Sequence, residues 1–441
     1  MRKIGIKKIA LETLFCFLTS AAAVADDNGA YTSYAPYSIF GVGDLFNGST
    51  AYNTTMGGVG IASRNNRYLN SLNPAAVTAR DSLAFMSDFS VYQNNRVMKQ
   101  GSAKSASNLF NINDFIISFP LFNHTAMMVG IKPYSATGYD FSYYETNPGV
   151  LASIGNLQHS YAGQGSMYQI FAAGGVNLFK NLNLGVEYIH YIGNYEKSYT
   201  QTASDAAALN VTNSSEMILS ANTAKFGLQY VINPSNKLQF VLGATYKLNA
   251  RLNGYINSSV TSGQASISSS ADTLAHMATP LYLADEAGVG ISMVYNRKFR
   301  AEFDYTRSDW TGSGFENQKG FSVNGAGGSP IFSPAVAQSF RFGVEYIPRP
   351  NDVRYYRNII AYRAGVYYTK DYYNVNGNSI YARGITLGVT LPVFQWYNGL
   401  TLGFEVGQRG SLKNSLILET YANFSLGINL FDIWFQQYRY E

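Results

Sequence analysis

The sequence has almost none of the residues from which disulfide frameworks and metal sites are built. Its 441 residues contain one cysteine, Cys16, and four histidines. A chain whose single cysteine lies near its start is not held together by disulfides. The histidines are far apart, and none has a second ligand at the spacing of a metal motif: His124, His159, His190 and His276. We therefore expect no metal site and no cofactor.

Motifs of known catalysts are also missing. The chain has no G-x-S-x-G sequence, which would mark a nucleophile at a sharp turn. The glycine-rich stretch Met56–Ala62 is not followed by the Lys-Ser or Lys-Thr pair of a phosphate-binding loop. The sequence therefore does not indicate an enzyme.

Charged residues are scarce and evenly mixed. They make up 13% of the chain, about half the usual share. The formal net charge is +5, and residues 1–25 carry four positive residues and one negative, which leaves +2 for the rest. No long run of one sign is present, so nucleic acid and polyanions are not expected partners.

Long apolar runs are absent after the amino terminus. No run of about 18 apolar residues is present there, so no transmembrane helix is predicted. The chain nevertheless contains 35 Tyr, 27 Phe and 41 Gly. A soluble protein with so few charges would be hard to keep in solution. A transmembrane β-barrel fits this composition, because only every second residue of its strands faces lipid.

The amino terminus has the form of a secretory signal peptide. A basic stretch, Met1–Lys8, precedes an apolar run that ends in Ala23-Val24-Ala25. The residue before Cys16 is Phe15, which is too large for a lipoprotein cleavage site. We expect residues 1–25 to be removed after export through the Sec pathway, and the rest to reside in the cell outer membrane.

After residue 80, apolar and polar residues alternate with the period of a β-strand. In Ser415–Leu430, for example, Leu416, Leu418 and Phe424 lie on one face and Asn423 on the other. Fourteen such strands are predicted at 82–93, 108–119, 124–136, 166–178, 181–197, 216–231, 236–250, 285–296, 298–309, 335–347, 358–370, 380–392, 399–410 and 415–430.

The connections between these strands alternate in length. Bacterial barrels have an even strand number, short periplasmic turns and longer external loops, so both ends of the barrel domain are predicted on the periplasmic side. Two connections are exceptions: 348–357 is long for a turn, and 411–414 is short for an external loop.

The charges fall on the polar phase of these strands. A charge on the lipid face near the midplane costs about 2–4 kcal/mol, so the polar phase is predicted to face the lumen. Positive and negative residues are balanced there, which suits pairing around a plug better than an ion-selective pore. The predicted luminal residues are Arg300, Glu302, Asp304, Arg341, Glu345, Arg363, Glu405, Arg409 and Glu419.

The chain is accordingly predicted to be all-β: a 14-stranded antiparallel transmembrane β-barrel (residues 81–431) with an amino-terminal hatch, or plug, in its lumen (residues 26–80). The hatch segment has no sustained alternation and is rich in Gly, Asn, Ser and Ala. Residues 432–441 are predicted to form a periplasmic tail after the last strand, which Phe431 would close.

A hatch that ends in Asn73-Pro74-Ala75 just before fourteen strands resembles the FadL family of outer-membrane transporters for long-chain fatty acids and aromatic hydrocarbons. The resemblance covers the whole chain after residue 25 in architecture, but its motif is three residues long. It implies that Asn73, Pro74 and Ala75 act in gating, and that the protein is a monomer. The expected partners are the outer-membrane lipid bilayer, the barrel assembly machinery and a hydrophobic small molecule such as a fatty acid.

The resemblance also implies a kinked third strand that opens the wall sideways. Gly130 and Pro133 are the candidates for this opening, because Pro133 has no N–H for the strand ladder. Passive uptake of a hydrophobic compound with lateral release is the first functional reading. A FadL-like accessory barrel of a protein secretion system, similar to type IX, is the alternative, and a general porin is a third reading.

Overall fold

The structure is a computed structural model that describes residues 33–433, apart from 82, 123, 180, 205–209, 264, 275–279, 319–320, 322–330 and 394–397. The predicted signal peptide, 1–25, lies outside the described residues. The predicted tail, 432–441, lies outside them from residue 434 on.

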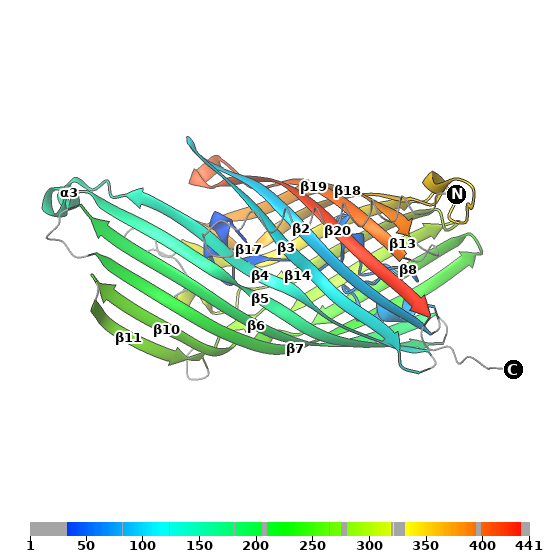
Figure 1. Ribbon diagram of the computed structural model, residues 1–441. Helices are drawn as coiled ribbons and strands as arrows, with labels where there is room; N and C mark the ends of the chain where they lie inside the picture. The colour runs from blue at the N-terminus through cyan, green and yellow to red at the C-terminus, as the bar shows by residue number, and fades with distance from the viewer. Residues whose placement is uncertain are drawn as a thin grey trace, which may run out of the picture.

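Fourteen antiparallel strands close into a barrel, in which β20 pairs with β2 (Figure 1). The predicted all-β architecture and the fourteen predicted strands are confirmed. The barrel strands are β2 (Ala84–Gln100), β3 (Ala103–Pro120), β4 (Thr125–Tyr144), β5 (Leu157–Leu178), β6 (Leu182–Ala203), β7 (Val211–Ser235), β8 (Leu238–Lys247), β13 (Glu286–Tyr295), β14 (Phe299–Asp309), β16 (Val336–Tyr346), β17 (Ala361–Val375), β18 (Asn378–Val393), β19 (Asn398–Gly410) and β20 (Leu418–Ile433).

One side of the barrel continues well beyond the predicted strand ends. The outer parts of β5, β6 and β7 are joined by β10 (Asn253–Ser262) and β11 (Ala265–Thr273), which form the extended wall at the left of Figure 1. Much of the predicted loops 137–165, 198–215 and 251–284 is therefore strand, and most of the predicted loop 94–107 belongs to β2 and β3. Over 198–215 and 251–284 the reason is compositional: Ser, Thr and Asn occupy both faces, so no hydrophobic alternation marks a strand that water can solvate on both sides.

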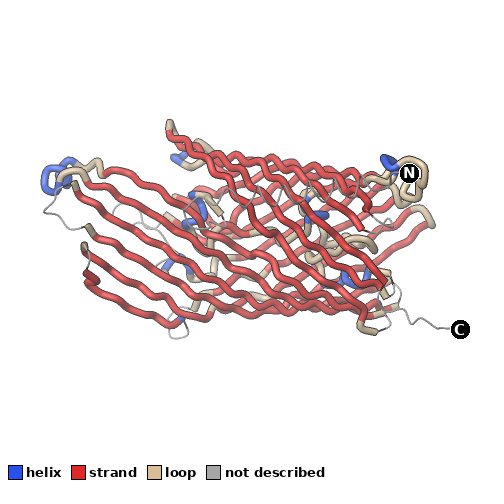
Figure 2. Tube along the Cα trace, viewed as in Figure 1, coloured by secondary structure: helices blue, strands red, loops and turns tan. Residues whose placement is uncertain are grey.

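Short elements fill the connections and the interior (Figure 2). They are η1 (Pro36–Ile39), β1 (Asp44–Leu45), α2 (Ala51–Thr54), η2 (Pro74–Ala79), α3 (Pro148–Ile154), β9 (Ala250–Arg251), β12 (Tyr282–Leu283), η4 (Phe315–Asn317), β15 (Phe332–Pro334), η6 (Tyr356–Asn358) and η7 (Lys413–Ser415). No helix in the described part of the chain is long and apolar enough to span a membrane.

Residues 33–81, here called the N-terminal segment, pack against inward-facing glycines of the wall. Ten of the fourteen barrel strands each contribute at least one glycine whose missing side chain leaves room for residues 51–78. These glycines are Gly175, Gly185, Gly227, Gly243, Gly290, Gly343, Gly365, Gly388, Gly403 and Gly427. A Cβ at any of them would lie within 3.0 Å of an atom of the segment, so the backbones approach more closely than in an ordinary core.

The two faces of the wall differ in polarity. Large apolar side chains such as Phe89, Val186 and Leu228 are exposed on the outside. Inside, at the end with the long connections, buried aromatic residues fill the lumen between the N-terminal segment and the loops. The largest are Trp310, Phe315, Phe321, Phe332 and Tyr373.

Candidate functional site

The Asn73-Pro74-Ala75 motif lies at the start of η2, against the inner wall. Asn73 is fully buried, and its side-chain oxygen accepts a hydrogen bond from the Ala75 N–H at 3.0 Å, which caps the short helix. Its amide nitrogen donates to the carbonyl oxygens of Ile61 at 2.7 Å and Leu228 at 3.2 Å. One side chain thus joins η2, the glycine-rich turn and strand β7.

Three paired glycines form the seat on which this motif rests. Gly175 on β5, Gly185 on β6 and Gly227 on β7 are cross-strand neighbours. A Cβ on Gly185 would lie 2.6 Å from the Pro74 carbonyl oxygen, and one on Gly227 would lie 2.8 Å from the Pro74 ring. The motif therefore sits where three adjacent strands have no side chains.

The glycine-rich turn at residues 57–61 is bound by polar side chains of the wall. Asp304 accepts hydrogen bonds from the backbone N–H groups of Gly60 at 2.6 Å and Ile61 at 2.9 Å. Arg341 donates to the Gly57 carbonyl at 2.9 Å. Two residues predicted to line the lumen thus hold the N-terminal segment by its main chain.

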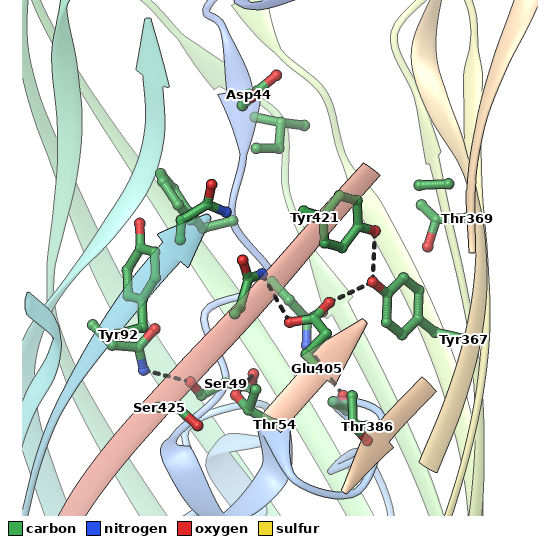
Figure 3. Close-up of a pocket in the computed structure, with 18 of the residues that line it drawn as sticks. Asp44, Ser49, Thr54, Tyr92, Tyr367, Thr369, Thr386, Glu405, Tyr421 and Ser425 are labelled. Atoms are coloured by element: carbon green, nitrogen blue, oxygen red, sulfur yellow. Dashed lines mark hydrogen bonds between the residues drawn. The ribbon is translucent and has the colours of Figure 1, made fainter. Parts of the chain in front are cut away.

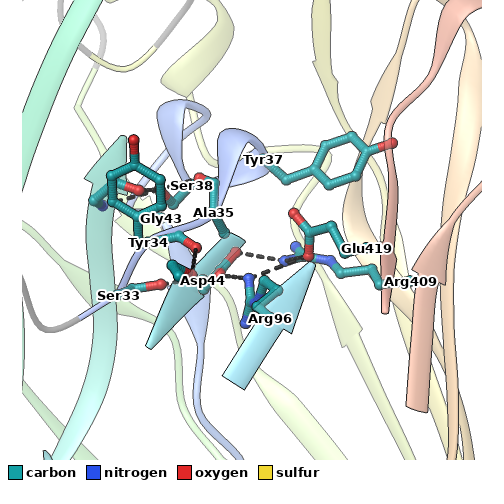
Figure 4. Close-up of polar contacts among 12 residues, drawn as sticks. Ser33, Tyr34, Ala35, Tyr37, Ser38, Gly43, Asp44, Arg96, Arg409 and Glu419 are labelled. Carbon is teal, nitrogen blue, oxygen red and sulfur yellow. Dashed lines mark hydrogen bonds and ion pairs between the residues drawn. The ribbon is translucent and has the colours of Figure 1, made fainter. Parts of the chain in front are cut away.

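A buried ion network ties β1 to the seam between β2 and β20 (Figure 4). Arg409 bonds Asp44 at 2.6 Å and Asp371 at 2.8 Å. Arg96 bonds Asp44 at 3.2 Å and Glu419 at 3.1 Å. The two guanidinium groups therefore bridge the N-terminal segment to the wall through three carboxylates.

The Asp44 carboxyl depends on these two arginines. Burial by itself would raise its pKa, but Arg409 and Arg96 outweigh burial and hold the pKa of Asp44 below its ordinary value. The group therefore stays ionised inside the lumen.

A second network lies beside α2. Arg300 bonds Glu302 at 3.1 Å and approaches Glu345 at 3.6 Å, and Arg363 bonds Glu345 at 2.8 Å. The Arg363 guanidinium also lies 4.3 Å from the centre of the Tyr52 ring. Glu405 accepts hydrogen bonds from Tyr367 and Asn423. All nine charged residues predicted for the lumen thus take part in inward-facing polar contacts.

Three members of these networks were not predicted from the sequence. Asp44 lies in a segment without alternation, and Arg96 and Asp371 fall in stretches predicted as long loops, 94–107 and 371–379. The balance of positive and negative residues along the predicted lumen indicated that ion pairs form, but it does not identify which residues pair.

The ladder between the second and third barrel strands ends early. The β3–β4 pairing stops at Phe115 and Ile131, although both strands continue. Gly130 lies within this ladder, and Pro133 lies two residues beyond its end, where the β4–β5 register shifts. The two predicted opening residues therefore flank the point at which β3 and β4 separate (Figure 1).

Strand β1 occupies part of the edge of β4 that β3 leaves. Asp44 pairs with Ala136, and Leu45 pairs with Ser135. Just before this point, Lys132 is buried and donates to the Gly48 carbonyl at 3.0 Å and to the Ser71 hydroxyl at 3.2 Å. The N-terminal segment thus contacts the wall directly beside the separated strands.

A cavity of about 340 Å³ lies between the N-terminal segment and the wall (Figure 3). Its lining is mixed: charged and hydroxyl groups such as Arg341, Glu405 and Tyr421 lie among apolar side chains and glycines. Leu45, Phe46 and Leu109 add an apolar side toward β3. The cavity therefore joins charged groups to an apolar margin. Among the described residues, no three His, Cys, Asp or Glu side chains are grouped as metal ligands.

Solved structures of similar fold are described as a FadL homologue and as toluene transporters. A FadL homologue from Pseudomonas aeruginosa is 11% identical, with 88% of this chain and 98% of that chain covered and a TM-score of 0.57. The Pseudomonas putida toluene transporter TodX is 12% identical, with 89% and 100% covered and a TM-score of 0.57. The Ralstonia pickettii toluene transporter TbuX is 13% identical, with 86% and 97% covered and a TM-score of 0.55.

These similarities confirm the predicted resemblance to FadL-type barrels at the level of the fold. No curated protein matches the sequence. The family model described as BamG matches residues 5–441, so the chain belongs to the BamG family.

Proposed function

We propose that this protein is an outer-membrane barrel that lets a hydrophobic compound pass passively from the outer side into the bilayer, with release between β3 and β4. The observation that carries the proposal is the early end of the β3–β4 ladder at Phe115 and Ile131. In this reading the N-terminal segment is the hatch, and Asn73, Pro74 and Ala75 anchor it.

A lateral exit is physically reasonable for such a compound. An acyl chain loses about 0.8 kcal/mol for each CH₂ that enters water, and an exit into lipid avoids that loss. The cavity reaches β3 at Leu109 and Asn113 and reaches β1 at Leu45, so it borders the place where the two strands separate.

The lining of the cavity favours an amphiphile over a pure hydrocarbon as cargo. A ligand site is usually apolar with a few polar groups that fix orientation. Here Arg341, Glu405 and Tyr421 supply charged and hydroxyl groups, and Leu45, Phe46 and Leu109 supply an apolar margin. A long-chain fatty acid would place its carboxylate near Arg341 and its chain toward Leu45 and Phe46.

The proposal is tested by locking β1 to β4. Leu45 and Ser135 are cross-strand partners, and directly opposed strand residues are close enough for a disulfide. In the variant Leu45→Cys/Ser135→Cys, we expect uptake of a labelled fatty acid to fall on oxidation and to recover on reduction. The matched control is Thr200→Cys/Thr212→Cys on the outer wall, whose hydroxyls lie 3.0 Å apart.

Equal uptake by the oxidised and reduced forms of the Leu45–Ser135 variant would refute release beside β1. Saturable binding of a long-chain fatty acid to the refolded protein, weakened by Asn73→Ala, would support the cargo assignment. The absence of binding across a panel of fatty acids and aromatic compounds would refute it.

An accessory barrel of a protein secretion or assembly system is the second candidate. The close seating of the N-terminal segment on ten wall glycines favours it, because a plug held by its backbone is poorly suited to repeated movement. This candidate predicts that no small molecule is taken up and that a protein partner is lost on extraction. A general porin would need an open water path past the N-terminal segment, and conductance of the purified protein in a planar bilayer tests it.

A further inference from the structure

One connection at the end with the short turns is much longer than its neighbours. It runs from residue 347 to 360, between β16 and β17, and appears as the gold loop at the right of Figure 1. The adjacent turn between β13 and β14 has only Asn296, Arg297 and Lys298. The two are joined, because the Ile347 N–H donates to the Lys298 carbonyl at 2.8 Å. The longer connection therefore projects beyond the rim.

The connection is held in shape by its own hydrogen bonds. Asp352 accepts from the backbone N–H groups of Arg354 at 2.8 Å and Tyr355 at 3.1 Å, and from the Asn358 amide. The Arg349 N–H donates to the Asn358 carbonyl at 2.8 Å, which closes the loop at its base. A compact surface loop with close ends and internal contacts is frequently functional.

Its outward side chains are those found at protein interfaces. Val353 is 90% exposed, and Tyr355 and Tyr356 are about half exposed. Exposed Arg and Tyr are enriched in the residues that dominate binding energy. The Arg354 and Arg357 guanidinium groups lie 5.3 Å and 5.8 Å from the centre of the Tyr355 ring, so one aromatic ring supports both cations.

The charge of this surface is strongly one-sided. The two adjacent connections carry five cationic side chains and one acid, Asp352: Arg297, Lys298, Arg349, Arg354 and Arg357. The Asp352 carboxylate is occupied by hydrogen bonds inside the loop. Arg349 lies 3.8 Å from Asp352, so the tip keeps an excess of four positive charges over negative ones.

We propose that the tip formed by residues 347–358 and 296–298 docks an acidic, partly apolar surface of a soluble protein on the periplasmic side. Arginine forks bind carboxylates in a fixed bidentate geometry, and Val353 and Tyr355 supply the apolar contact between them. A fixed loop loses little conformational freedom on binding, which suits a shaped partner better than a fluid lipid surface. The assignment to the periplasm rests on the proposed function as an outer-membrane barrel and on the orientation predicted from the short turns.

The experiment replaces Val353 of the full-length protein with a benzophenone amino acid and irradiates cells that produce it. We expect one protein adduct of defined mass, reduced about ten-fold or more by Arg354→Glu/Arg357→Glu. Arg354→Lys/Arg357→Lys keeps the charge but loses the bidentate fork, so it should reduce the adduct less than the Glu variant does. Reversing the acidic residues near the cross-linked site of the identified partner should restore the adduct to the Glu variant. The matched control carries the benzophenone at Ser235, the last residue of β7 beside the β7–β8 turn at the same end, and should give no such adduct.

The proposal is overturned by three results. These are no protein adduct at Val353, only lipid adducts there, or an adduct that the Glu variant retains in full. Folding of each variant is checked by its heat-dependent migration on a gel. A separate Val353→Cys variant tests the orientation. Labelling of this variant in intact cells by a membrane-impermeant maleimide would refute the proposed orientation together with the docking site. If the Cys variant is not labelled and the benzophenone variant gives no protein adduct, the docking site alone is refuted.

Discussion

The seat of the N-terminal segment can be tested by adding a single methyl group at Gly185. A Cβ at this position would lie 2.6 Å from the Pro74 carbonyl oxygen, 0.8 Å short of the 3.4 Å at which ordinary contact begins. It would lie closer still to the Pro74 carbonyl carbon and the Ala75 nitrogen. All three are backbone atoms of η2, so no side-chain rotation relieves the collision, and the segment itself has to shift.

Overpacking of this kind costs about 1–3 kcal/mol, which corresponds to about a 5- to 150-fold change in an equilibrium constant. We expect Gly185→Ala to raise the unseated population of the N-terminal segment by that factor and to leave the barrel closed. The measurement is the rate of trypsin cleavage at Arg64, Arg67 and Arg80 in the refolded protein. This rate follows the open population when opening and closing are fast relative to cleavage.

The matched control is Gly174→Ala on the neighbouring strand β5. A Cβ at Gly174 meets no atom within 4 Å, since this residue faces away from the lumen. Both substitutions remove a glycine from a strand, so any gain in strand propensity is shared. If Gly185→Ala is cleaved no faster than Gly174→Ala, a Cβ at Gly185 does not displace η2, and the wall glycines do not seat the N-terminal segment.

Three further changes probe the same contacts. Asn73→Ala removes the amide that binds the Leu228 carbonyl and should destabilise the seated segment by about 1–3 kcal/mol, measured by the same cleavage; an unchanged rate would contradict a structural role. Arg409→Met leaves Asp44 and Asp371 buried without their main partner and should lower thermal stability by about 3–5 kcal/mol, in contrast to a surface Arg383→Met control. The pKa of Asp44 is lowered in the folded protein, so its contribution to the stability of the seated segment is complete at neutral pH. This contribution declines below about pH 5, as the pH falls through the folded pKa. Asp44→Asn should remove this part of the acid sensitivity of the segment, which pepsin cleavage measures.

Local patterns in the sequence identified most of the barrel. The two-residue period of a strand depends only on neighbouring residues, so the fourteen strands and their inward phase could be predicted without knowledge of their partners. Arg300, Glu302 and Arg363 face the lumen because lipid penalises charge on the other phase. The outer ends of β5 to β7 escaped prediction because hydroxyl and amide side chains give no contrast between the two faces.

The contacts that build the candidate site depend on the tertiary structure. Asp44 and Arg409 are 365 residues apart in the sequence, and the residues around each of them do not predict that they form an ion pair. From the sequence alone, Gly185 and Gly227 only weaken their strands. Their role becomes visible in the closed barrel, where η2 packs against them. The end of the β3–β4 ladder is likewise a property of strand pairing: Pro133 alone is compatible with a simple strand end. Composition and alternation thus determined the barrel and its polarity, whereas closure of the wall around the N-terminal segment decided which residues hold that segment and where the strands part.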